Sequence, residues 1–97
     1  MPMYVTLIRY TEQGIKTFKD LPSRLEETRQ AGETAGAKLV AFYLTMGQYD
    51  AVVILDAPDD VTAARLALGI AAQGNVRLET LRAYPEAEYR KIIASLP

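Results

Sequence analysis

Four segments of the chain are rich in β-branched and aromatic residues, a composition typical of β-strands. They cover residues 3–10, 38–46, 49–56 and 76–84. Successive side chains of a strand point to opposite faces. The first segment therefore presents Met3, Val5 and Leu7 on one face and Tyr4, Thr6, Ile8 and Tyr10 on the other. Both sets are largely apolar, so we expect both faces of the resulting sheet to be covered.

The second and third strand segments are separated by Gly47 and Gln48. Two residues are the spacing of a tight β-hairpin, and a glycine at this point can adopt a positive φ. The pattern therefore predicts an antiparallel pair over residues 38–56.

Residues 15–35 have the apolar spacing of a helix, in which Ile15 and Phe18 form a short first turn before the main part. Pro22 suits the first turn of its main part, and Gly36 is the expected stop. The side facing the sheet is expected to contain Leu21, Leu25, Thr28 and Ala35. The charged residues expected to lie in solvent are Arg24, Glu26, Glu27 and Arg29.

A second helix is predicted to begin at Asp59, whose carboxylate suits an N-cap, and to end at Gly74. Its buried stripe is expected to contain Val61, Ala64, Leu68 and Ala71. A third, short helix is predicted over residues 86–95.

The order of these elements is strand-helix-strand-strand-helix-strand with a tail helix. It predicts an α+β, ferredoxin-like fold, in which two helices cover one face of a four-stranded antiparallel sheet. The uncovered face is expected to carry Tyr4, Ile8, Tyr43, Val52 and Ile54. Such a patch is larger than a monomer normally exposes. We therefore expect a homodimer or higher homo-oligomer in which two sheets pair into a dimeric α+β barrel, with cover by the tail helix as the alternative.

The composition of the chain limits the kinds of catalysis and metal binding that its side chains can support. The 97 residues are expected to form one domain over 1–97. Cys, His and Trp are absent, which excludes disulfides, thiol and imidazole catalysis, and metal or haem ligation through His or Cys. The net charge is −1, with interspersed signs, so we expect no nucleic-acid or membrane partner. No cofactor is called for. The first residues lack the pattern of a signal peptide, and a cytoplasmic location is expected.

The sequence resembles the GYD domain family, small bacterial proteins with a Gly-Tyr-Asp signature. The likeness extends over nearly the whole chain and rests on these segments: residues 11–14, 19–24, 43–50, 58–60, 74–76 and 79–80. The signature itself is Gly47 with Tyr49 and Asp50, and Gln48 interrupts it. The resemblance implies a ferredoxin-like fold that pairs into a dimeric α+β barrel. It implies little about activity.

A weaker likeness covers about a third of the chain, from Gly47 to Thr80. This stretch is similar to the effector-binding domain of leucine-responsive transcription regulators, although the spacing from Gly74 to Thr80 is one residue off. In those regulators the modules pair through their sheets and bind small metabolites between subunits. The helix-turn-helix is missing here, so the likeness does not imply DNA binding.

Six residues are candidates for ligand binding: Tyr4, Tyr43, Gly47, Tyr49, Asp50 and Arg82. Asp50 can serve as an acid, a base or a ligand acceptor beside Tyr49, or it can cap the N–H groups of the hairpin turn. The three tyrosines are expected to share a sheet face, where they line either a ligand pocket or a dimer interface. Arg82 either reaches solvent at a strand end or is buried, in which case it needs an anionic partner.

For a buried Arg82 the sequence offers Glu79, Asp50 or an anionic ligand as partner. Arg9, Tyr10 and Tyr84 also lie near strand ends, and whether they converge with Arg82 depends on sheet face and register. Asp56, Asp59 and Asp60 lack the alternating spacing of a calcium loop, and helix capping accounts for the last two. We predict no metal site.

Two functions remain open. The first is a small oligomeric module that binds a small molecule or another protein. The second is a cofactor-independent enzyme of the monooxygenase or isomerase kind, acting on a small aromatic or anionic substrate. Its catalytic set would comprise Asp50 as base, Arg82 polarising an anion, and Tyr49 and Tyr43. The missing imidazole disfavours the enzyme, because His is the usual general base.

Overall fold

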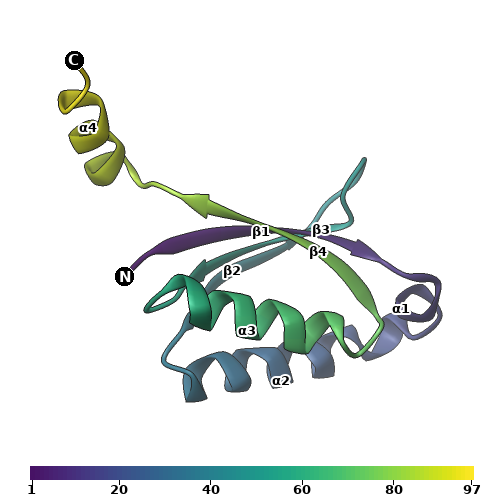
Figure 1. Cartoon of the computed structure of the whole chain (residues 1–97). Coiled ribbons are helices and arrows are strands. Elements are labelled where there is room, and N and C mark those ends of the chain that lie inside the picture. The colour runs from purple at the N-terminus through teal and green to yellow at the C-terminus, as the bar shows by residue number, and fades with distance from the viewer.

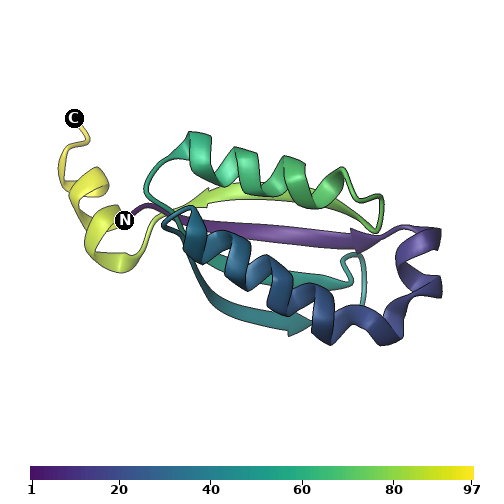
Figure 2. The same cartoon turned by 90° about the horizontal axis from the view of Figure 1, so that it is seen from below.

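The strands form at the β-branched and aromatic runs. In the computed structural model, which describes residues 1–97, they make one antiparallel sheet in the order β2-β3-β1-β4. Their bounds are Met3–Tyr10 for β1, Lys38–Leu44 for β2, Ala51–Asp56 for β3 and Val76–Ala83 for β4. β1 is central and pairs with both β3 and β4. This order, with two long helices on one face of the sheet, confirms the ferredoxin-like α+β prediction (Figures 1 and 2).

The predicted first helix is divided into three pieces. They are α1 over Glu12–Lys16, a 3₁₀ turn over Phe18–Asp20 and α2 over Leu21–Thr34, with Pro22 in the first turn of α2 as expected. α3 spans Asp60–Ala71 and α4 spans Glu86–Ala94. Two predicted stops are confirmed by left-handed glycines, with φ of 81° at Gly36 and 83° at Gly74.

The hairpin between β2 and β3 is confirmed, but its loop is longer than two residues. Gly47 has a φ of 112°, as expected for the turn. The Thr45 N–H donates to the Asp50 carbonyl at 2.9 Å, and the Thr45 hydroxyl donates to the Tyr49 carbonyl at 2.6 Å. These local bonds close a loop over residues 45–50, so the strands stop earlier and resume later than the apolar pattern indicates.

The register of the strands corrects the expected uncovered face. Val5 lies opposite Ile54, and Leu7 lies opposite Val52, so these four side chains share a face. The helices cover the other face, where Tyr4 is 4% exposed and Ile8 is 7% exposed. The prediction that Tyr4 and Ile8 lie with Tyr43, Val52 and Ile54 is therefore wrong. We call the face without helices the open face; its apolar residues are Met3, Val5, Leu7, Ala41, Tyr43, Val52, Ile54, Leu81 and Ala83.

The core beneath the helices is built around the Tyr4 ring, which packs with Ala37, Ala57 and Ala63. Leu55 and Leu66 complete this cluster from β3 and α3. Small alanines surround the ring because the β2, β3 and α3 backbones approach it closely.

The predicted buried stripe of α3 is wrong. Val61 is 60% exposed and Leu68 is 71% exposed, whereas Ala63 is buried and Leu66 packs against the core. α3 is apolar around much of its circumference, so periodicity alone does not tell which side meets the sheet.

α4 does not cover the sheet. It extends away from the body at the end where β1 begins, so the tail helix is not the cover of the open face (Figure 1). Its large apolar side chains remain exposed: Tyr89, Ile92, Ile93 and the following Leu96. None of the helices combines the length and the apolar character that a membrane crossing requires.

The predicted N-cap of α3 gives a pH-dependent test. Asp59 accepts a hydrogen bond from the Thr62 N–H at 2.8 Å, and this bond lowers the pKa of the Asp59 carboxyl. A lowered pKa in the folded state means that the cap stabilises above the unfolded pKa and is lost as the pH falls through the folded value. We expect Asp59→Asn, which still caps but does not titrate, to lose less Tm than wild type between pH 6 and pH 3. Equal losses in thermal melts would contradict this assignment.

Candidate functional site

The six candidate residues separate toward opposite ends of β1. Arg82 lies directly opposite Tyr4, near the start of the strand. Asp50 lies at the other end, where its N–H donates to the Ile8 carbonyl at 2.8 Å. A strand rises about 3.3 Å per residue, so Tyr4 and Tyr10 are about 20 Å apart. Within one chain the structure therefore does not bring Asp50 and Arg82 together on a small substrate.

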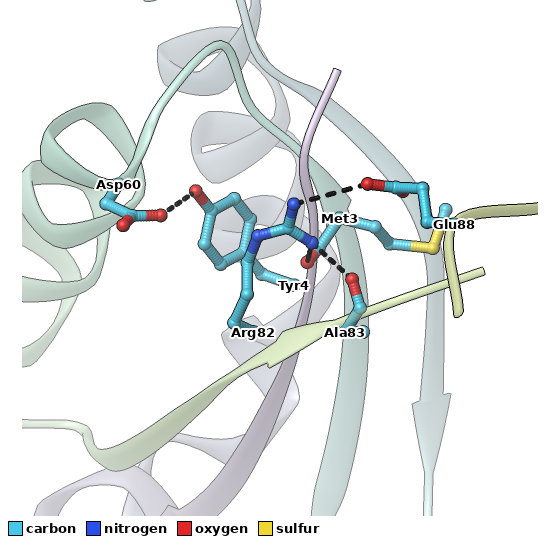
Figure 3. A network of polar contacts seen from close by, with 6 residues as sticks. All are labelled: Met3, Tyr4, Asp60, Arg82, Ala83 and Glu88. Carbon is cyan, nitrogen blue, oxygen red and sulfur yellow. Dashed lines mark hydrogen bonds and ion pairs between the residues drawn. The ribbon is translucent and has the colours of Figure 1, made fainter. Parts of the chain in front are cut away.

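Around Arg82 the structure forms a network of polar contacts (Figure 3). The guanidinium forms an ion pair with Glu88 of α4 at 3.5 Å and donates to the carbonyls of Met3, at 3.3 Å, and Ala83. It also lies over the rings of Tyr4, at 5.6 Å, and Tyr84, at 4.6 Å.

Glu88 is not the partner that the sequence suggested for Arg82. Glu79 is three positions away on β4, and alternation along the strand places it on the open face. Asp50 is at the far end of β1. The ion pair with Glu88 instead joins α4 to the sheet, a contact that depends on how the tail helix leaves β4.

Tyr4 completes this network on the side of α3. Its hydroxyl donates to the Asp60 carboxylate at 2.5 Å, and this bond raises the pKa of Tyr4 to about 12. The phenol therefore stays protonated at neutral pH and acts as a donor, not as a base. The network connects β1, β4, α3 and α4, and its polar groups already have partners within the chain.

A second cluster surrounds the hairpin on the side of the open face. The Tyr49 hydroxyl donates to Glu79 at 2.7 Å, which raises the pKa of Tyr49. The Arg9 guanidinium lies 4.8 Å from the centre of the Tyr49 ring and donates to the Gln48 carbonyl at 3.2 Å. These contacts hold the loop against β1 and β4. Met46, at the loop tip, is 99% exposed.

The three candidate tyrosines do not share a face, which corrects the prediction. Tyr43 is 60% exposed and pairs with Val52 on the open face, and Tyr49 lies near this face through Glu79. Tyr4 is buried beneath the helices. The tyrosines therefore do not form one cluster within a single chain.

Asp50 is half-buried and extends the hydrogen bonding of the sheet. Its carboxylate accepts from the Tyr10 N–H at 2.9 Å, beyond the last residue pair of β1 and β3. The group that it caps belongs to β1 and not to the hairpin turn. Asp50 also lines a shallow pocket with Tyr10, Phe18 and Leu44. A ligand-binding role of Asp50 stays a prediction.

The acidic side chains do not form a cluster that could hold a metal ion. Asp59 caps α3, and Asp60 accepts from Tyr4. No group of three or more acidic side chains in the structure has the arrangement of a metal site.

Arg24 is the residue that sequence reasoning missed. It was expected in solvent, but it is half-buried and lines a cavity between the helices and the sheet. Its position three residues after Leu21 and four before Thr28 places it on the inward side of α2. That spacing indicates an inward position, but the prediction placed Arg24 in solvent because of its charge.

Comparison with known proteins identifies the family. The model described as GYD domain matches residues 4–93. The chain belongs to the GYD domain family. A relative from Thermus thermophilus is described as "Glutamine synthetase and cystathionine beta-lyase binding protein". It is 37% identical over 89 residues, which cover 91% of this chain and 94% of the relative. No solved structure matches.

Each residue of the Gly-Tyr-Asp signature thus has a structural role in the hairpin loop. Gly47 supplies the left-handed turn, Tyr49 connects the loop to β4, and Asp50 connects it to β1. The inserted Gln48 contributes its carbonyl to Arg9. Together these residues hold the hairpin in a defined orientation beside the open face.

Proposed function

We propose that this GYD protein is a protein-binding module that works as a homodimer, paired through the open faces of two sheets. The observation that carries the proposal is the open face itself. Its apolar residues run across all four strands. No helix of the chain covers this side of the sheet (Figure 1). Exposed patches of this kind mark protein interfaces in soluble folds.

The charges at the rim of the open face suit a self-complementary pairing. Arg9 and Arg77 lie opposite each other at one end, and Asp56 lies at the other end beside Met3. A two-fold axis that sets the two β1 strands antiparallel brings the basic end of one protomer near the acidic end of its partner. The same pairing removes the apolar centre from water.

The partner is suggested by the relative. Its description names two enzymes of amino-acid metabolism, glutamine synthetase and cystathionine β-lyase, as what that protein binds. The similarity extends over nearly all of both chains, so we propose enzymes of these two kinds as the first partners to test. The surfaces left free by sheet pairing include the hairpin tip at Met46 and the apolar side of α4.

Charge on the open face is expected to abolish pairing. Ile54 lies at the centre of the face, opposite Val5 and Ala41. Wild type is expected at twice the 10.7 kDa of one chain in light scattering after size exclusion, and Ile54→Lys at the mass of one chain. Leu68→Lys, on the exposed outer side of α3, is the matched control and is expected to leave the mass unchanged. A monomeric wild type would contradict the dimer.

Partner binding needs a separate experiment. Wild type, Ile54→Lys and Leu68→Lys are immobilised, and purified glutamine synthetase and cystathionine β-lyase from the source organism are passed over them. We expect wild type and Leu68→Lys to bind at least one enzyme, and Ile54→Lys to bind about tenfold more weakly or worse because avidity is lost. Failure of wild type to bind either enzyme would contradict the proposed partners, whatever the oligomeric state.

A further inference from the structure

A cavity of about 110 Å³ lies between α2, α3 and the covered face of the sheet. Most of its lining is apolar and comes from α2, α3 and the sheet: Leu21, Leu25, Phe42, Val53, Ile70 and Leu78. It lies on the opposite side of the sheet from the open face. Anything bound there is therefore independent of the proposed dimer.

Two buried polar atoms of the lining residues have no hydrogen-bond partner. The Arg24 guanidinium donates through Nη1 to the Thr17 hydroxyl at 3.1 Å, but its Nη2 is buried without a hydrogen bond. The Tyr10 hydroxyl is likewise buried and unpartnered. Both residues line the cavity. They are the only buried side-chain polar atoms in the chain that lack a partner.

The charge of Arg24 is also uncompensated. None of the ion pairs of the chain includes it. The carboxylate of Asp50 is close enough to influence the pKa of Tyr10, but it accepts the Tyr10 N–H. Burial raises the pKa of the Tyr10 phenol, which therefore remains a donor at neutral pH. Two donors and one positive charge thus meet at an apolar cavity.

A buried donor without a partner is costly, and the cost is larger when the donor belongs to a charged group. An anion at this position would satisfy both groups, because a carboxylate accepts from a guanidinium and from a phenol at the same time. Most of the other lining residues offer hydrocarbon contact, and Thr6, Thr28, Gln73 and Asn75 are the polar exceptions. The arrangement matches an amphipathic acid with its charged end at Arg24 and its apolar end between the helices.

We propose that this cavity binds a small monocarboxylate, with the carboxylate on Arg24 and Tyr10 and the hydrocarbon part among the apolar residues of α2, α3 and the sheet. The volume limits the hydrocarbon part. An apolar cavity of about 150 Å³ holds benzene, so this cavity of about 110 Å³ suits a hydrocarbon part of fewer than six carbons. Long-chain fatty acids do not fit.

Matched probes separate the contributions of the two ends. Butyrate and isovalerate are titrated calorimetrically into the full chain, beside 1-butanol and 3-methyl-1-butanol, which keep the apolar part without the charge, and acetate, which keeps only the charge. We expect the two acids to bind at least about tenfold more tightly than their alcohols, and acetate not to bind measurably. Equal affinities of acid and alcohol, or no binding of either acid, would overturn the proposal.

Substitutions in the cavity lining test whether the acid binds at Arg24 and Tyr10. Arg24→Leu is expected to reduce acid binding at least about tenfold and to leave the alcohols unaffected, and Tyr10→Phe to weaken acid binding by a smaller factor. Arg29→Leu is the matched control on α2, since Arg29 pairs with Glu26 at 3.7 Å. If Arg24→Leu does not fold, Tyr10→Phe with Arg29→Leu carries the test. Unchanged acid binding in Tyr10→Phe and Arg24→Leu would overturn the proposal.

The open-face variant distinguishes this site from a ligand held between two sheets. Ile54→Lys is expected to bind butyrate and isovalerate as wild type does, even where it no longer dimerises. Loss of acid binding in Ile54→Lys, with retention in Arg24→Leu, would place the acid between the sheets and overturn the assignment. Failure of the dimer leaves the acid site standing, because the two lie on opposite faces.

Discussion

Gly14→Ala is expected to destabilise the fold by about 3 kcal/mol or more, the largest loss from any single methyl group in this chain. A Cβ at Gly14 would lie 2.0 Å from the Asn75 carbonyl oxygen and 3.0 Å from its carbon. Backbone atoms cannot rotate out of the way as a flexible side chain can. Either α1, which contains Gly14, or the turn that contains Asn75 must therefore move.

The segments around Gly14 are held together on both sides, so movement breaks hydrogen bonds. The Thr11 N–H donates to the Asn75 carbonyl at 3.0 Å, and the Thr11 hydroxyl donates to the Gly74 carbonyl at 2.6 Å. Gln13 donates to the Gln73 carbonyl at 3.0 Å. These bonds attach α1 to the turn between α3 and β4, and the methyl group would separate them.

Urea unfolding followed by circular dichroism measures this effect, and Gly69→Ala is its matched control. Gly69 lies within α3, with nothing within 4 Å of an added Cβ. There alanine improves helix propensity, so we expect Gly69→Ala to raise the unfolding free energy by up to about 1 kcal/mol. A Gly14→Ala variant as stable as wild type would show that the turn does not press on α1.

Tyr4→Ala is expected to lower the Tm by about 15 °C or more, because it empties the centre of the core. The ring is 4% exposed and is surrounded by Ala37, Ala57 and Ala63, whose short side chains cannot fill the space. The helices can close this space only by moving toward the sheet. The lower Tm is therefore caused mainly by the cavity that the substitution leaves and by the lost van der Waals contacts of the ring.

Tyr4→Phe separates the ring from its hydroxyl. This variant keeps the packing and removes only the hydrogen bond to Asp60, so we expect a Tm loss of about 5 °C or less. Thermal melts at one pH and one protein concentration compare the two variants. If Tyr4→Phe loses as much as Tyr4→Ala, the bond to Asp60 and not the packing holds this end of the fold.

Several features were predictable because they depend on residues close in the sequence. The β-branched runs located all four strands, Asp59 marked the start of α3, and Gly36 and Gly74 marked turns with positive φ. The order of the elements then left few alternatives to a ferredoxin-like sheet. The signature at Gly47, Tyr49 and Asp50, together with matching segments along nearly the whole chain, suggested the family that the comparison confirms.

The candidate site was less predictable, because it depends on residues distant in the sequence. Both faces of β1 are apolar, so alternation separated Tyr4 from Val5 but did not tell which side the helices cover. For the same reason, the grouping of Tyr4 with Tyr43 was wrong. Arg82 met Glu88 of α4 and not Glu79, because the direction of the tail helix is set outside β4.

Local sequence thus determined which elements form and their order along the chain, and it fixed several of their ends, such as Asp59, Gly36 and Gly74. Hydrogen bonds within a turn or between nearest neighbours stabilise those choices. Only the tertiary structure decided which face is open, that Arg24 turns inward beside Tyr10, and that Asp50 and Arg82 lie far apart. These depend on strand register and helix packing, in which many weak contacts between distant segments act together.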